Sequence, residues 1–199
     1  MDSNPFEGWT VAERADLVMS LFAQHGHEAY IGEPVSQLEH AVQCAQLAAA
    51  NGADDATILA ALLHDIGHLL EHFSNGKMLA QMDGFGLENH DALGAEFIRQ
   101  IGLGEKVAAL AGSHVQAKRY LTAVDAGYYA RLSDASRQTL RFQGGPMRED
   151  EVAAFEADPL HEAYTRLRLW DEAAKQTDLP LPDNLDIYRQ MIINQLNKE

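Results

Sequence analysis

An imidazole and a carboxylate stand side by side in an apolar part of the chain, at His64 and Asp65 in the stretch Leu62-Leu63-His64-Asp65-Ile66-Gly67-His68. An ionised aspartate is rarely buried without a partner, because its desolvation is costly. The usual partner of a buried imidazole and carboxylate is a metal ion. The pair therefore predicts a metal site.

The rest of the chain supplies further residues of ligand type. The six candidates are His40, His64, Asp65, His90, His114 and Asp171. The first three and Asp171 could hold one ion, and the Asp65 carboxylate could bridge to a second ion bound by the other two histidines. Imidazole suits iron, zinc, copper or nickel better than magnesium or calcium. Each ion would keep open positions for a substrate or for oxygen, as a catalytic site requires.

These ligands must be positioned by helices, because the apolar periodicity is helical almost throughout. The first expected helix runs from Val11 to Gln24 and stops at Gly26, and a second begins at a Ser36–Glu39 capping box and closes at Gly52. Further helices are expected from Asp54 or Asp55 through a continuous apolar run at 58–70, then roughly over 87–101, 105–121, 127–142, 148–157, 160–176 and 184–197. Strand signals are weak. We expect one all-α domain over residues 1–199, with fraying only at residues 1–10 and the last few.

Composition narrows the class of protein. The chain has 199 residues, is 46% hydrophobic and carries a formal charge of −15, which excludes nucleic acid as a partner because no basic stripe is present. A single cysteine, Cys44, excludes an intramolecular disulfide. No secretory leader or transmembrane run is visible, so we expect a soluble cytoplasmic protein without a membrane partner. Met191, Ile192 and Leu196 of the last helix predict either core or a dimer face.

Several polar residues lie one helical turn from the ligands. Positions three or four apart share a helix face, so these side chains should point into the same site. They offer two cations, an imidazole and two hydroxyls, a set suited to a tetrahedral oxyanion such as phosphate or phosphonate. The residues are His68, Lys118, Ser136, Thr139 and Arg168.

Tyr30 and Glu33 come shortly before the first ligand, His40. Glu33 could bind a cationic group of the substrate, and Tyr30 could cap the metal or present a cation–π face. A tyrosine ahead of a helix is also a common structural staple.

The order of His, His-Asp and Asp resembles that of the HD-domain superfamily of helical metal-dependent hydrolases, and His90 and His114 resemble its dinuclear branch. With the anion-binding residues and the segment Leu140-Arg141-Phe142-Gln143-Gly144-Gly145-Pro146-Met147, nearly the whole chain resembles one small family. These are the HD-domain mixed-valence di-iron oxygenases of organophosphonate catabolism, which act on 2-amino-1-hydroxyethylphosphonate or its N-trimethyl analogue.

The resemblance implies an Fe(II)/Fe(III) pair on the six ligands, with the five anion-binding residues holding the phosphonate. It implies catalytic roles for Tyr30, Glu33 and His68, with Tyr30 occupying an iron position until substrate displaces it and Glu33 as its partner in that movement. The expected reaction is O2-dependent cleavage of the carbon–phosphorus bond, releasing phosphate and glycine betaine, or glycine from the primary amine. The trimethylammonio compound is the preferred substrate on this reading.

The ligand set alone leaves other reactions open. A metal-dependent phosphohydrolase acting on a phosphate monoester or nucleotide would use the same ligands with metal-bound hydroxide as nucleophile. A resemblance to inositol oxygenase would require a polyol pocket in place of the anion site. A non-catalytic module that binds a phosphorylated signal would be expected to lack ligands, and none is missing.

Overall fold

The computed structural model describes residues 4–30, 32–70, 82, 87 and 89–198. Within these ranges the chain forms helices and no named strand, with an isolated bridge between Ala29 and Ser36, which confirms the all-α expectation. The helices are α1 (Val11–His25), α2 (Gln37–Ala50), α3 (Asp55–Leu63), α4 (Ile66–Leu69), α5 (His90–Ile101), α6 (Glu105–Ala111), α7 (His114–Val124), α8 (Tyr128–Arg131), α9 (Asp134–Phe142), α10 (Glu149–Glu156), α11 (His161–Ala173) and α12 (Asp186–Leu196). None of the described helices is long and apolar enough to cross a membrane.

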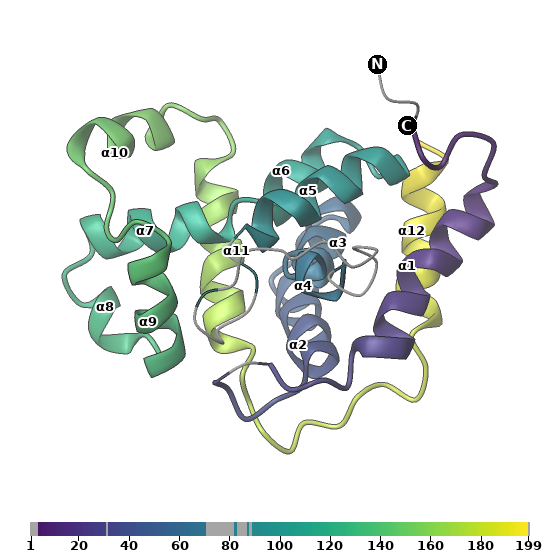
Figure 1. Cartoon of the computed structure of the whole chain (residues 1–199), viewed down its shortest axis with the longest axis horizontal. Coiled ribbons are helices and arrows are strands. Elements are labelled where there is room, and N and C mark those ends of the chain that lie inside the picture. Colours follow the sequence, from purple (N-terminus) through teal and green to yellow (C-terminus); the bar gives the residue numbers. More distant parts are fainter. Residues whose placement is uncertain (1–3, 31, 71–81, 83–86, 88, 199) are drawn as a thin grey trace.

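Helix α3 lies at the centre of the molecule, and α2, α6, α11 and α12 pack against it (Figure 1). Helices α1 and α12 pack together on one side, whereas α7 to α10 lie on the other. One hydrophobic core joins α1 to α6 with α11 and α12, and it buries every residue of α3 from Ala56 to Leu63. A helix that is apolar on all sides is expected at such a position.

The helix starts follow the side-chain caps expected from the sequence. The Ser36 hydroxyl accepts the backbone N–H of Glu39, and the Glu39 carboxylate accepts the backbone N–H of Ser36 in return. This capping box fixes the start of α2 three residues before His40. Of the two aspartates considered for α3, Asp54 is the cap, through the backbone N–H of Thr57 at 3.0 Å.

The expected single helix through the apolar run at 58–70 is wrong, because the chain breaks at His64 and Asp65 between α3 and α4. Asp65 leaves helical geometry, with φ −102° and ψ 11°. Adjacent residues of an α-helix point about 100° apart, so an unbroken helix could not aim both side chains at one ion. The expected helix over 105–121 is likewise divided into α6 and α7, and the break directly precedes His114. The expected helix over 127–142 is divided into α8 and α9.

The apolar residues of the last helix belong to the core. Ile192 and Leu196 are buried against it, and Met191 packs at its edge. This placement accounts for their apolar character within the chain itself.

Candidate metal centre

Four histidine side chains converge at the break between α3 and α4, and each ring donates a hydrogen bond to a backbone carbonyl. Nδ1 of His64, His90 and His114 donates to the carbonyl three residues earlier, at 2.8, 2.9 and 3.0 Å. Nδ1 of His40 donates to the carbonyl of Ala174 at 2.8 Å. These bonds place the proton on Nδ1, so each Nε2 turns an available lone pair toward the interior of the site.

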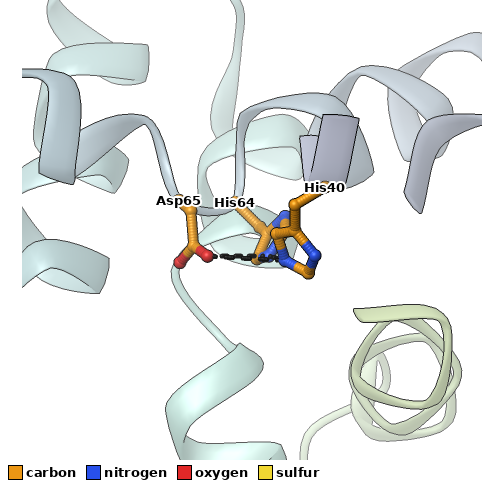
Figure 2. A group of neighbouring side chains, drawn as sticks. All are labelled: His40, His64 and Asp65. Carbon is orange, nitrogen blue, oxygen red and sulfur yellow. Dashed lines mark hydrogen bonds and ion pairs between the residues drawn. The ribbon is translucent and has the colours of Figure 1, made fainter. Parts of the chain in front are cut away.

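The first group of ligand atoms comes from α2, the α3–α4 break and α11. His40 Nε2 and His64 Nε2 lie 3.1 Å apart, and Asp65 Oδ2 lies 3.6 and 3.2 Å from them. Figure 2 shows the two imidazoles and the Asp65 carboxylate converging on one point. Asp171 Oδ1 closes the group, 3.4 Å from His40 Nε2 and 3.8 Å from His64 Nε2.

The second group uses the other oxygen of the same carboxylate. His90 Nε2 and His114 Nε2 lie 2.9 Å apart, and Asp65 Oδ1 lies 3.4 and 3.3 Å from them. Both histidines are the first residues of their helices, α5 and α7. Asp65 therefore directs one oxygen at each group, as a bridging carboxylate does.

The residues fit metal ions. Ligands about 2.1 Å from an ion lie roughly 3.0–3.4 Å from one another, close to the spacings of both groups. Asp65 Oδ2 and Asp171 Oδ1 are buried and have no hydrogen-bond partner, which is costly unless a cation sits between them. Burial alone would raise the pKa of Asp65, but the neighbouring imidazoles hold it well below its usual range. Both carboxylates are therefore ionised and available as ligands.

His68 lies close enough to Asp65 and His90 to be considered a fourth ligand of the second group. Its ring stacks on His90 with centroids 4.0 Å apart, and its Nδ1 accepts the backbone N–H of Leu87 at 3.4 Å. This is the opposite tautomer to the four ligand histidines, and it leaves Nε2–H as a donor. Burial lowers the pKa of His68 to about 3, so the ring is neutral. The geometry favours a donor to substrate over a ligand.

A pocket opens onto the metal groups, and the sequence-predicted anion-binding residues line it. Lys118 is 97% buried, and its ammonium donates to the Thr139 hydroxyl at 2.9 Å. It has no acidic partner among the described residues, and burial with the nearby charge of Arg168 lowers its pKa to about 7. Ser136 and Arg168 lie on the same wall. A buried amine of this kind is poised to bind an anion.

Arg168 makes more contacts with other side chains than the sequence indicated. Its guanidinium pairs with Asp171 and with Glu172, and its Nε donates to the Tyr128 hydroxyl at 2.9 Å. Arg168 thus orients a metal ligand while it faces the pocket.

Tyr30 lies over the first metal group. Its ring stacks on His40 at 4.1 Å and 13°, and its hydroxyl interacts with the Asp65 carboxylate. Burial and the charges of Asp65 and Asp171 raise the pKa of Tyr30 well above its usual value. The phenol therefore stays protonated next to the carboxylate that spans both groups.

Sequence reasoning missed the partners of Glu33. Glu33 lines the pocket, but its carboxylate is bound by Lys175 at 2.9 Å and by the hydroxyl of Ser133. Lys175 also lies 3.2 Å from Glu172. The sequence offers only a partial signal for Lys175, which follows Asp171 by four positions but lies two residues beyond the end of α11 at Ala173. Gln143, from a segment with no role assigned by sequence, also lines the pocket.

The fold and the site define an all-α metalloprotein whose candidate metal ligands come from α2, α5, α7, α11 and the break between α3 and α4, around a buried carboxylate. The model of the HD domain matches residues 38–162, and the chain belongs to this family. That match holds five of the six ligands, and Asp171 lies beyond it.

Similar proteins indicate to which branch of the HD-domain family the chain belongs. The chain is 39% identical over 168 residues to a [1-hydroxy-2-(trimethylamino)ethyl]phosphonate dioxygenase (glycine-betaine-forming) of Leisingera caerulea, covering 84% of this chain and 83% of that protein. It is 41% identical over 176 residues to a hydroxymethylphosphonate dioxygenase of Gimesia maris, covering 87% and 84%. An uncharacterized protein of Acanthamoeba polyphaga mimivirus is 37% identical over 188 residues, covering 94% and 84%. The chain therefore belongs to the HD-domain phosphonate dioxygenases and is an oxygenase.

Proposed function

We propose that this protein cleaves the carbon–phosphorus bond of a 1-hydroxyphosphonate with O2, releasing phosphate and a carboxylic acid. The observation that carries the proposal is the bridging geometry of Asp65, with one oxygen toward each imidazole pair, beside a buried lysine that no described carboxylate pairs with. The relatives named as phosphonate dioxygenases support the same reaction class.

We further propose two iron ions, as an Fe(II)/Fe(III) pair, on His40, His64, Asp65 and Asp171 and on Asp65, His90 and His114. Their chemistry when bound is the activation of O2 and the chelation of the substrate hydroxyl and one phosphonate oxygen. Conversion of the substrate to an acid and phosphate removes four electrons, which one O2 accepts, so no external reductant is consumed.

The residues of the chain position the phosphonate. Lys118 and Arg168 supply the charge, while the hydroxyls of Ser136 and Thr139 and the Nε2–H of His68 supply hydrogen-bond donors. Tyr30 lies over the first metal group, so substrate entry there requires its phenol to move. The proposed partner in that movement is Glu33.

The sequence names two candidate substrates, the trimethylammonio compound that gives glycine betaine and the amino compound that gives glycine. Both need a binding site for a cation, and Glu33 is the residue proposed for it. The relative from Gimesia maris is named for a substrate with no cation, hydroxymethylphosphonate, which adds a third candidate.

The test is phosphorus NMR of the iron-loaded protein with each of the three compounds, in air and without oxygen. Conversion of a phosphonate signal to phosphate only when oxygen is present is the expected result. The competing phosphohydrolase predicts phosphate from a phosphate ester without oxygen, with manganese, cobalt or nickel as effective as iron. Release of phosphate from an ester panel but from none of the phosphonates would reject the oxygenase proposal.

A further inference from the structure

Glu33 is the carboxylate that a cationic substrate would need, and the chain already supplies a cation to it. Lys175 Nζ lies 2.9 Å from Glu33 Oε1, and the two side chains are only 10% and 8% exposed. The Ser133 hydroxyl donates to the same oxygen. Solvent screens a buried pair weakly, so Glu33 presents little net negative charge to the pocket.

The charges around Glu33 form a cationic wall. Glu172 is the neighbouring carboxylate, and it pairs with Arg168 and lies 3.2 Å from Lys175. Lys118 adds a third cation, which has no carboxylate partner in the part of the chain that the structure describes. Arg168 also pairs with Asp171, whose other oxygen faces the first metal group. Apart from that metal ligand, Glu33 and Glu172 are the two carboxylates set against three cations, so this wall has no excess negative charge for an additional cation.

The pocket also lacks an aromatic cage within its described lining. A quaternary ammonium donates no hydrogen bonds and is bound mainly by aromatic faces. Tyr30 is the one Phe, Tyr or Trp of the described lining, and one face of its ring is covered by His40. The imidazole of His68 is covered in the same way by His90. These faces cannot enclose a trimethylammonium group.

We infer that Lys175 determines substrate specificity by neutralising Glu33, so that the pocket selects a small 1-hydroxyphosphonate whose carbon carries no cationic group. This inference rests on the proposed function and revises the preference for an ammonium substrate that the sequence suggested. Hydroxymethylphosphonate is the smallest member of this class. Its reaction with O2 breaks the C–P bond and one C–H bond and gives formate and phosphate, with one added oxygen atom on carbon and one on phosphorus.

The experiment compares hydroxymethylphosphonate, 1-hydroxy-2-aminoethylphosphonate and its N-trimethyl analogue on the iron-loaded protein. Phosphorus NMR in air gives kcat/KM for each, and calorimetry without oxygen gives each Kd. The test variant is Lys175→Met, which removes the charge but keeps an unbranched side chain. Lys175→Arg keeps the charge, and Lys198→Met removes a cation that is 57% exposed, as a control for net charge.

The wild-type protein is expected to favour hydroxymethylphosphonate over both cationic compounds by at least about tenfold. Lys175→Met should shift that ratio toward the cationic compounds by roughly tenfold in both kcat/KM and Kd, whereas the other two variants should leave it unchanged. A wild-type preference for either cationic compound overturns the inference. An equal loss for all three compounds in Lys175→Met also overturns it, because that result marks a structural role.

If Lys175→Met does not fold, the wild-type ratio and its retention in Lys175→Arg still decide the question. Failure of the proposed function would give a different result from failure of this inference, because none of the three phosphonates would then release phosphate in air.

Discussion

The two walls of the site are held in place by different means. On the metal side, all four imidazoles are fixed by bonds to backbone carbonyls, from Ala61, Leu87, Ala111 and Ala174. On the substrate side, Lys118, Arg168 and Lys175 are held by other side chains, through hydroxyls and carboxylates. The geometry of the first wall thus depends on where the helices begin and break, and that of the second on the balance of charge.

This difference indicates which changes each wall can tolerate. A backbone anchor survives substitution of the surrounding side chains, so the metal wall can remain constant while the substrate wall varies. A side-chain network loses several contacts when one member changes. Substrate preference is therefore expected to be altered from the substrate wall without loss of metal.

The largest effect should come from Asp65, which both metal groups share. Asp65→Asn replaces one charged oxygen with an amide nitrogen that cannot act as a ligand, so we expect loss of bound metal and a fall in turnover of about a thousandfold or more. Metal analysis and phosphorus NMR measure the two effects. Asp134→Asn, at a side chain 92% exposed, removes the same charge as a control. Two metals per chain with full turnover would disprove the bridging assignment.

A change in the backbone packing should disturb the metal wall without touching a ligand side chain. A Cβ at Gly67 would lie 1.9 Å from the carbonyl oxygen of His90, so Gly67→Ala must push α4 and α5 apart. We expect a cost of about 1–3 kcal/mol in the free energy of unfolding, and a fall in kcat/KM of roughly a hundredfold as His90 is displaced.

Calorimetry and metal analysis test this prediction. Gly8→Ala is the control for backbone strain alone, because Gly8 has φ 83° and its Cβ would meet nothing, whereas Gly67 has no positive φ and its Cβ would meet backbone. An unchanged Tm and metal content in Gly67→Ala would show that the spacing of α4 and α5 does not position the ligand.

The sequence was sufficient to predict an all-α fold and to single out the imidazoles and carboxylates that the structure brings together, because those residues differ in type from the apolar faces around them. It was not sufficient to predict the break at His64 and Asp65, because apolar periodicity continues across a break of two residues. The pairing of Glu33 with Lys175 joins the segment between α1 and α2 to the segment between α11 and α12, which are far apart in the sequence. Local spacing contains no information on such a contact, so Glu33 was interpreted as free to bind a substrate cation.

The substrate wall is tested most directly at Lys118, the cation for which the described residues supply no carboxylate partner. Lys118→Ala removes one charged hydrogen bond to the phosphonate, which is worth about 1.5–3 kcal/mol, so KM should rise roughly thirtyfold while kcat changes little. The metal content should be unchanged, in contrast to Asp65→Asn. Lys106→Ala, at a side chain 45% exposed, is the control. A fall in kcat with constant KM would place Lys118 in the chemical step and not in binding.

The smallest predicted effect is a dependence on pH that belongs to the substrate wall alone. Because the pKa of Lys118 is lowered to about 7, its ammonium is complete below that pH and is lost as the pH rises. Anion binding needs the charged form, so KM should rise by less than about tenfold between pH 7 and pH 8 and then level off, because its loss cannot exceed that of Lys118→Ala. Lys118→Arg stays charged over this range, so the ratio of the wild-type and variant KM values removes the contribution from ionisation of the substrate. A ratio that stays constant from pH 6 to 9 would mean that bound substrate or metal, and not Lys118, sets the charge of this wall.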